Sequence, residues 1–169
     1  MTPILIRPLD SSEWESFRDF RLAALLASPG SFYATFAKEI KLSPDKWRDR
    51  IAAPDHQVFG LLDGEKLIGI TAVFTDRDDP SGQTAHLAMS FILPPYRGQG
   101  LSRKLYDARL TWIIAQPQFK RVTAGHRASN DASRRAMQAQ GFVRIGQSSR
   151  LWPDGVTEDD VHYELVFSQ

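Results

Sequence analysis

Short apolar runs alternate along this chain with stretches in which apolar residues recur at helical intervals. The runs predict strands at residues 4–6, 58–62, 66–74, 85–93, 121–128, 143–151 and 161–167. The helical spacing, with capping residues, predicts helices that begin near Ser12, Ser43, Leu101 and Asn130. No repeat, low-complexity tract or linker divides the sequence, so a single domain over residues 1–169 is expected.

The connections between the second, third and fourth runs are short, which favours antiparallel pairing. Asp63-Gly64 between two apolar runs predicts a tight hairpin, because such turns need positive φ. The order is strand, two helices, three strands, helix, strand, helix, two strands, and it predicts an α/β (α+β) fold.

Composition narrows the class of protein. The 169 residues are 42% hydrophobic and 24% charged, as in an ordinary globular domain. The net charge is +1, so the chain lacks the overall positive charge that attracts nucleic acid. No apolar run is long enough to span a membrane, and the start lacks a signal-peptide pattern. The chain has no cysteine and no closely spaced histidines, so no metal site is expected. We therefore expect a cytoplasmic protein that binds neither nucleic acid nor membrane.

The segment Arg97-Gly98-Gln99-Gly100-Leu101-Ser102 lies between a predicted strand and a predicted helix. Glycines there allow positive φ and close approach of a ligand to the backbone. Several N–H groups and the positive end of the helix dipole then face one point, which suits a phosphate. Taken alone, the segment is equally consistent with a merely tight connection. It is neither a P-loop nor a complete G-x-G-x-x-G fingerprint.

Two motifs give this segment a context. Residues 92–102 resemble the motif Gln/Arg-x-x-Gly-x-Gly/Ala of the GNAT superfamily of acetyl-coenzyme-A-dependent N-acyltransferases, with Ser102 in the last small position. A second family motif, an asparagine followed by Gly-Phe, resembles Asn130 with Gly141-Phe142. The resemblance covers essentially the whole chain. It implies a mixed, mostly antiparallel sheet of six to seven strands, splayed between the fourth and fifth strands and flanked by about four helices.

The resemblance also implies a ligand and its contacts. Acetyl-CoA would be the co-substrate, with its pyrophosphate on backbone N–H groups and its pantetheine arm along the fourth strand and the motif asparagine. The implied cofactor-binding residues are Ile92, Leu93, Arg97, Gly98, Gln99, Gly100, Leu101, Ser102 and Asn130. Asn130 has the alternative role of a helix N-cap alone. A backbone N–H near Ile92 would stabilise the oxyanion that forms when an amine attacks the thioester.

Two positions depart from the family pattern. Met137 stands where many members have a tyrosine that protonates the leaving thiolate, and a thioether has no proton to give. Another group or water would supply the proton, or the thiolate would leave unassisted. His126 stands where a small aliphatic residue is usual, and it is a candidate proton shuttle or a buried histidine satisfied by the backbone.

Candidates for the acceptor side are fewer. Glu39 follows an aromatic segment and could bind an ammonium ion or act as general base, or it could be an exposed carboxylate. Phe32 and Phe36 are candidate walls of a substrate pocket, with packing between helices as the alternative. Alternation along the strand places Ser90 and His86 on one face, and Leu87, Met89 and Phe91 on the other. Residues 154–160 are expected to form a solvated acidic loop, with attraction of a cationic acceptor as the alternative.

The leading hypothesis is an acetyltransferase for a small-molecule amine that attacks acetyl-CoA directly in a ternary complex. The alternatives are acetylation of a protein N-terminus or lysine, and a non-catalytic acyl-CoA-binding module, which the absent tyrosine at Met137 keeps open. A homodimer also stays open.

Overall fold

The structure is a computed structural model that describes residues 2–168. Its helices are η1 (Ser11–Glu13), α1 (Trp14–Ala27), α2 (Phe36–Glu39), α3 (Pro44–Ile51), η2 (Pro94–Tyr96), α4 (Leu101–Ile114) and α5 (Asp131–Ala139). Its strands are β1 (Ile4–Pro8), β2 (Ala52–Ala53), β3 (His56–Asp63), β4 (Lys66–Thr75), β5 (Thr84–Ile92), β6 (Arg121–Arg127), β7 (Val143–Leu151) and β8 (Thr157–Val166).

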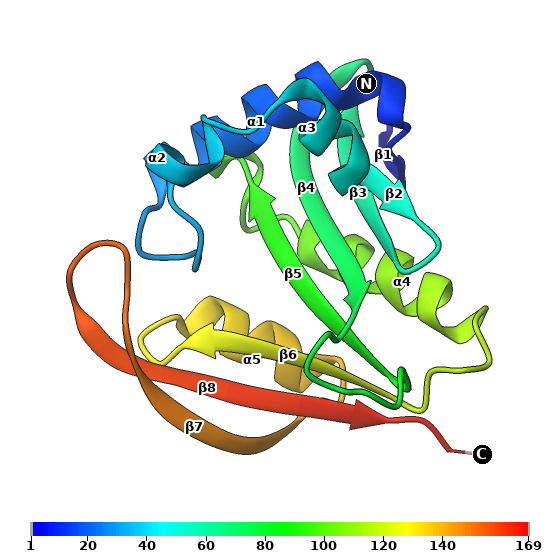
Figure 1. Cartoon of the computed structure of the whole chain (residues 1–169), viewed down its shortest axis with the longest axis vertical. Coiled ribbons are helices and arrows are strands. Elements are labelled where there is room, and N and C mark those ends of the chain that lie inside the picture. Colours follow the sequence, from blue (N-terminus) through cyan, green and yellow to red (C-terminus); the bar gives the residue numbers. More distant parts are fainter. Residues whose placement is uncertain (1, 169) are drawn as a thin grey trace.

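One twisted sheet runs through the molecule in the order β1-β3-β4-β5-β6-β8-β7, with β2 paired to β3 (Figure 1). Every pair is antiparallel except β5 with β6. The predicted fold class is confirmed. The short strand β2 raises the number of strands to eight, and the four-residue helix α2 adds to the predicted helices.

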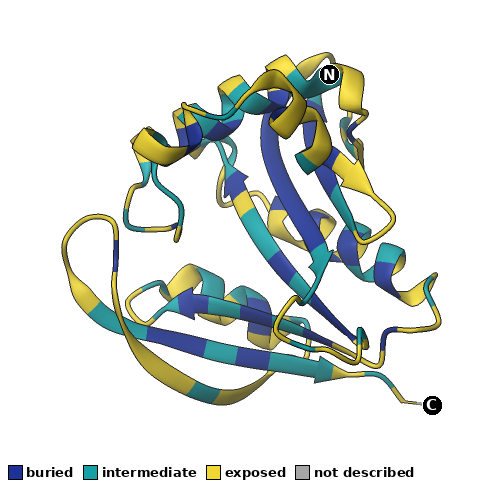
Figure 2. Ribbon diagram, in the orientation of Figure 1, coloured by how far each residue is buried: buried dark blue, intermediate teal, exposed yellow. Residues whose placement is uncertain are grey.

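Each face of the sheet has its own core. Phe17 of α1 and Trp47 of α3 pack with Ile70 of β4 on one face. Tyr106 of α4 and Met137 of α5 pack against the strands on the other face. Burial is uneven along the sheet: the centre of β4 is buried, whereas the edge strand β7 is almost wholly exposed (Figure 2). The central strands, which flank the site, are therefore held by packing on both faces.

The two parallel strands stay together for only a short distance. The strands β5 and β6 pair from Thr84 with Arg121 to His86 with Thr123 and then diverge (Figure 1). Because β2 precedes them, these are the fourth and fifth strands of the predicted splay. The remainder of β5 keeps β4 as a partner on one edge, while its other edge faces an open wedge. Such an edge offers unpaired backbone donors and acceptors to a ligand.

A β-bulge interrupts β5 inside this wedge. Ile70 pairs with Phe91 and Ala72 with Ala88, so two residues of β5 lie opposite Thr71 alone. One of the two, Met89, has φ of 58°, which is uncommon for a residue with a side chain. Bulges bend a strand and are common beside active sites.

The bulge overturns the alternation that the sequence suggested. An extra residue reverses the faces beyond it, since side-chain direction has a period of two. Leu87 lies in the core under α4 and α5, but Phe91 lies in the core under α1 and α3. Ser90 accordingly does not share a face with His86. Its hydroxyl lies 2.8 Å from that of Thr71 instead.

The positive φ at Met89 yields a stability prediction. We expect Met89→Ile to lower the free energy of unfolding by about 1–2 kcal/mol more than Met89→Leu, because a β-branched side chain is strained in the left-handed region. The two variants have matched volume, so burial changes little between them. Urea unfolding of both proteins measures the difference. Equal stabilities would contradict the backbone conformation at this bulge.

Candidate active site

The glycine-rich turn has the backbone that its sequence predicted. Gly98 and Gly100 have φ of 72° and 73°, and an added Cβ at either would meet no heavy atom within 4 Å. Gly100 is the N-cap of the 14-residue helix α4 and provides no side-chain cap. The first N–H groups of α4 therefore point into open space at the positive end of the helix dipole.

Side chains on either side hold the turn in place. The Tyr96 hydroxyl donates to Asp63 at 2.8 Å and ties η2 to the β3–β4 hairpin. Arg97 Nε donates to the carbonyl of Ile92 at 2.8 Å, and its guanidinium lies 5.0 Å from the centre of the Phe91 ring. These contacts fix the position of the glycine-rich turn relative to the end of β5.

The hydrogen bonds at the end of β5 decide which way its N–H groups point. Leu93 N donates to Ile68 O of β4 at 2.9 Å. Because N–H groups alternate along a strand, the N–H of Ile92 points away from β4, toward the wedge. A donor fixed in this way is available to a ligand between β5 and β6.

Asn130 begins helix α5 on the far side of the wedge. Its side-chain oxygen accepts from Ser133 N at 3.1 Å, which confirms its role as N-cap. The cap uses only the oxygen. The NH₂ group makes no hydrogen bond to another residue among 2–168 and can donate to a ligand.

His126 and Met137 face the α5 side of the sheet. His126 Nδ1 lies 2.7 Å from the carbonyl of Arg127 and Nε2 lies 3.2 Å from the Tyr163 hydroxyl. The ring is buried and both nitrogens have partners, which matches the alternative of a satisfied core histidine. Met137 is buried in the same core, as a packing residue would be.

His86 marks the point where β5 and β6 part. Its Nδ1 lies 2.8 Å from Thr123 Oγ1, across the last register pair of the two strands. The ring packs against that of Phe74, with 5.2 Å between centroids and 47° between the ring planes. Burial lowers the pKa of His86, and Asp76 and Asp160 offset this only in part. A neutral imidazole with Nε2 unbonded to the described residues can accept a proton at neutral pH.

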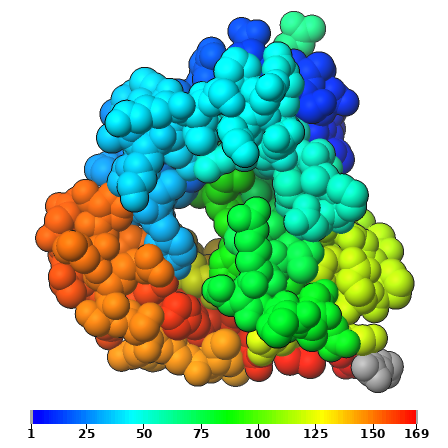
Figure 3. All heavy atoms as spheres, viewed as in Figure 1, coloured from blue at the N-terminus to red at the C-terminus, as the bar shows by residue number. Residues whose placement is uncertain are grey.

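Across the wedge from His86, the α1–α2 connection meets the β7–β8 hairpin. The Tyr33 hydroxyl donates to Asp160 Oδ2 at 2.7 Å, and the Tyr33 ring lies 5.4 Å from that of Trp152. Burial, together with Asp160, raises the pKa of Tyr33, so the phenol stays protonated as the donor. In the space-filling view, an opening remains at the centre of this face, between the α1–α2 connection, β5 and the β7–β8 hairpin (Figure 3).

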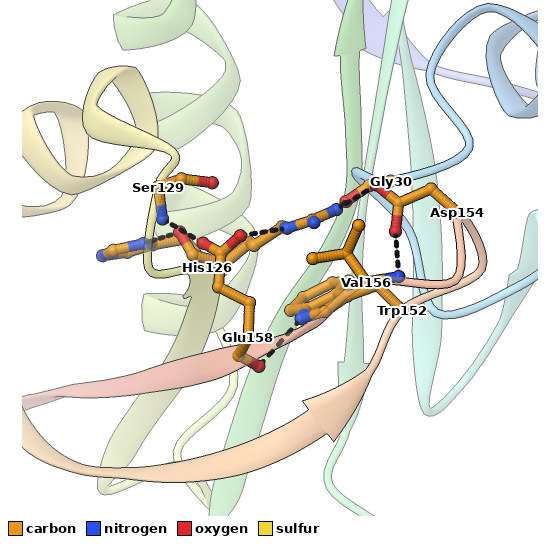
Figure 4. Close-up of polar contacts among 8 residues, drawn as sticks. Gly30, His126, Ser129, Trp152, Asp154, Val156 and Glu158 are labelled. Atoms are coloured by element: carbon orange, nitrogen blue, oxygen red, sulfur yellow. Dashed lines mark hydrogen bonds and ion pairs between the residues drawn. The ribbon is translucent and has the colours of Figure 1, made fainter.

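Arg127 braces this junction. Its guanidinium donates to Glu158 at 2.8 Å, to Asp154 at 2.6 Å and to the carbonyl of Gly30 at 3.1 Å. Figure 4 shows Gly30, Asp154 and Glu158 converging from separate segments of the chain. We call the contacts of Tyr33 and Arg127 together the roof of the wedge.

The remaining acceptor candidates take structural positions. Phe32 is buried, 6.1 Å from Phe91 between centroids, with the Arg21 guanidinium 4.8 Å from its ring centre. Phe36 is partly buried against the same core. The packing alternative accounts for both, whereas the neighbouring Tyr33 reaches the wedge.

Glu39 is buried and ion-paired, not an exposed carboxylate. Arg21 donates to both carboxylate oxygens, at 3.0 and 3.2 Å, and Arg50 lies 2.9 Å from Oε1. Burial by itself would raise the pKa of Glu39, but the hydrogen bonds and charges of the two arginines outweigh it and lower the pKa. The geometry disfavours Glu39 as a general base, because both lone-pair regions already face cations. It fastens α2 to α1 and α3.

This ion pair generates a prediction. Glu39→Gln should lower the free energy of unfolding by about 3 kcal/mol at pH 7, because it leaves Arg21 buried without a counter-charge. A lowered folded pKa gives stability that is present above the unfolded pKa of about 4.3 and is lost as pH falls through the folded value. Urea unfolding should therefore show the gap between native protein and variant narrowing in acid. A gap that is small at pH 7 would contradict the pairing.

Sequence reasoning did not single out Asp160, Tyr33 or Arg127 as individual site residues. The stretch 154–160 was expected to be a solvated loop, but β8 begins at Thr157 and Asp160 is buried within it. The acidic run was the one sequence signal for a carboxylate at this side of the wedge. The partner of Asp160, Tyr33, is 127 residues away in the sequence, and no local pattern signals that contact.

A splayed sheet with a glycine turn at the wedge defines a class of ligand-binding α/β domain. The sequence profile of the acetyltransferase (GNAT) family matches residues 14–142. The chain belongs to this family and is an acyltransferase. No curated protein matches the sequence.

Solved structures share the fold across the whole chain. An acetyltransferase of the GNAT family from Streptococcus pneumoniae superimposes with a TM-score of 0.84 at 17% identity, covering 98% of this chain and 100% of its own. YncA from Salmonella typhimurium, with its cofactor acetyl-CoA, gives 0.81 at 17%, covering 99% and 96%. The ribosomal-protein-S5-alanine acetyltransferase from Vibrio fischeri gives 0.78 at 17%, covering 95% and 91%.

Residues 2–168 lack two further features. No helix there has the length and apolar character needed to cross a membrane. No three histidine or carboxylate side chains of that range come together as a metal-binding group.

Proposed function

We propose that this protein transfers the acetyl group of acetyl-CoA to the primary amine of a small molecule, by direct attack in a ternary complex. The observation that carries the proposal is the wedge between β5 and β6. It has an open glycine turn at one end, inward-facing backbone donors along one side and a neutral imidazole at its apex. Family membership supports acetyl transfer. The geometry supports the proposed sequence of phosphate site, thioester site and base along the wedge.

In this proposal, the pyrophosphate of acetyl-CoA binds the N–H groups of residues 97–102. The pantetheine arm lies along Ile92 and Leu93 and receives a hydrogen bond from the Asn130 NH₂ group. The thioester carbonyl meets the Ile92 N–H, which stabilises the oxyanion. Binding of both substrates in the wedge makes the attack effectively unimolecular.

The amine has to lose a proton before it attacks, since a free amine with a pKa near 10.4 is charged at neutral pH. We assign the acceptance of this proton to His86 Nε2 through a chain of water molecules, because His86 lies six residues before Ile92 on β5 and cannot touch an amine held there. Asp160 and Arg150 shape the far side of the same space. For the leaving thiolate, Met137 offers no proton, so water or unassisted departure remains.

The roof favours a small acceptor over a protein chain. Tyr33 and the carbonyl of Gly30 are bonded to the sheet at 2.7 and 3.1 Å, so the α1–α2 connection crosses the opening. A peptide that lay along the sheet would have to break both contacts, whereas a compact amine can enter beneath them.

The direct test is release of free CoA thiol. Because the chain has no cysteine, every thiol that forms comes from acetyl-CoA. The panel should contain amino acids, aliphatic diamines, arylethylamines and short peptides with free N-termini. Turnover of a small amine supports the proposal, and turnover of peptides alone would replace it with protein acetylation. Acetyl-CoA binding without thiol release from any amine would indicate a non-catalytic module.

The glycine turn supplies a quantitative prediction. Gly100→Val should weaken CoA binding by about ten- to a hundredfold, the loss of one or two hydrogen bonds to a charged group. Gly82→Val is a matched control, because Gly82 also has positive φ, of 69°, and open surroundings but lies in a remote loop. Calorimetry should show native affinity for the control. Equal affinities for the two variants would count against the turn as the phosphate site.

His86 gives a prediction about pH. His86→Asn should lower kcat/KM by about a hundredfold and abolish the acidic limb of the pH profile, which in the native enzyme lies below about pH 6.5. Asparagine can keep the contact with Thr123, so folding is spared. The control His56→Asn changes a half-buried histidine, remote from the wedge, that is bonded to Asp55 and to the Asp49 carbonyl. An acidic limb retained in the His86 variant would exclude this residue as the base.

A further inference from the structure

One oxygen in the wedge lacks a partner. Asp160 is 1% exposed, and its Oδ2 is taken by the Tyr33 hydroxyl at 2.7 Å and by Arg150 Nε at 3.4 Å. Its Oδ1 is buried and has no hydrogen-bond partner among residues 2–168. A buried carboxylate oxygen is costly unless a donor reaches it, and a native fold seldom leaves one unused.

Gly125 on β6 leaves a narrow gap beside this oxygen, which we call the vacancy. A Cβ added to Gly125 would lie 3.2 Å from both Asp160 Oδ1 and the Val161 carbonyl oxygen and 3.5 Å from the Tyr33 hydroxyl. A methyl group would be crowded at these distances, whereas an N–H donor can approach the oxygens this closely. Thr123, two residues earlier on the same face, holds His86. The vacancy above Gly125 is therefore on the acceptor side of the wedge, beyond the apex at which β5 and β6 part.

The surrounding charges suit a cation. Asp154 and Glu158 both pair with Arg127, and Asp160 pairs with Arg150, so three carboxylates face two guanidinium groups. The two clusters adjoin, because Arg127 lies 5.4 Å and Arg150 lies 6.0 Å from the Trp152 ring. The surplus is one negative charge. An ammonium group would balance it and would also supply the N–H that Oδ1 lacks.

We infer that Asp160 Oδ1 binds an ammonium group of the acceptor above Gly125, which makes Asp160 a specificity-determining residue and Gly125 the residue that leaves room for the ligand. The inference rests on the proposed acetylation of an amine and adds its recognition site. It also gives Tyr33 and Arg150 a role: they fix the carboxylate by holding Oδ2, so that Oδ1 faces the vacancy.

The test measures amine binding separately from transfer. n-Butylammonium chloride is titrated into the CoA-saturated native protein, and the backbone amide signals of Gly125 and Asp160 are followed by NMR. We expect a saturable shift at both amides. Asp160→Asn should weaken this binding by at least about tenfold, as expected for a lost charged hydrogen bond. Gly125→Ala, which fills the vacancy, should weaken it similarly.

Asp159→Asn is the matched control. It changes a neighbouring aspartate on the opposite face of β8 whose Oδ2 accepts from Gln147 at 2.9 Å, and it should bind n-butylammonium like the native protein. Thermal melting verifies that all variants fold. With any amine that the thiol assay identifies, Asp160→Asn should raise KM for the amine at least about tenfold and leave KM for acetyl-CoA unchanged.

Two outcomes would overturn the inference. One is the absence of a saturable shift at Gly125 in the native protein, as expected if Oδ1 holds only water. The other is equal affinity in native protein and Asp160→Asn. Failure of the proposed function has a different signature, since it means no thiol release from any amine, whether or not n-butylammonium binds.

Discussion

The divergence of β5 from β6 is the constraint on which the site depends. After three register pairs, ending at His86 and Thr123, the strands no longer satisfy each other's backbone groups. Water or a ligand then has to complete the hydrogen bonding in the gap. The bulge at Met89 bends β5 into this course, and the strain of its positive φ is held by the cores on either side.

A wedge of this kind opens the molecule into two halves, and a small number of polar contacts rejoin them over the acceptor side. Arg127 and Asp160 lie on β6 and β8, while Gly30 and Tyr33 come from the connection that follows α1. The acidic pair on Arg127 keeps the guanidinium aimed at the Gly30 carbonyl. The side chains that join the two halves therefore adjoin the carboxylate that we propose as the acceptor site.

Buried charge in this protein has two distinct uses. Both oxygens of Glu39 are paired with arginine, so this carboxylate links α2 to α1 and α3. Asp160 has one oxygen paired and one without a partner among residues 2–168, and we propose that it recognises the acceptor. Two buried carboxylates thus differ in their partners, because only one of them has both oxygens paired. Burial alone does not identify a functional carboxylate.

The sequence by itself determined the order of elements, the glycine turn and the cap at Asn130, because these depend on local periodicity and on residues a few positions apart. The tertiary structure alone decided the pairing of Glu39 with Arg21, the reversal of faces beyond Met89 and the contact of Tyr33 with Asp160. A bulge adds one residue without changing the apolar pattern, and ion pairs join residues distant in the chain. Neither leaves a periodic pattern in the sequence. The family motif therefore predicts the position of the cofactor turn, whereas the contacts on the proposed acceptor side are seen only in the folded chain.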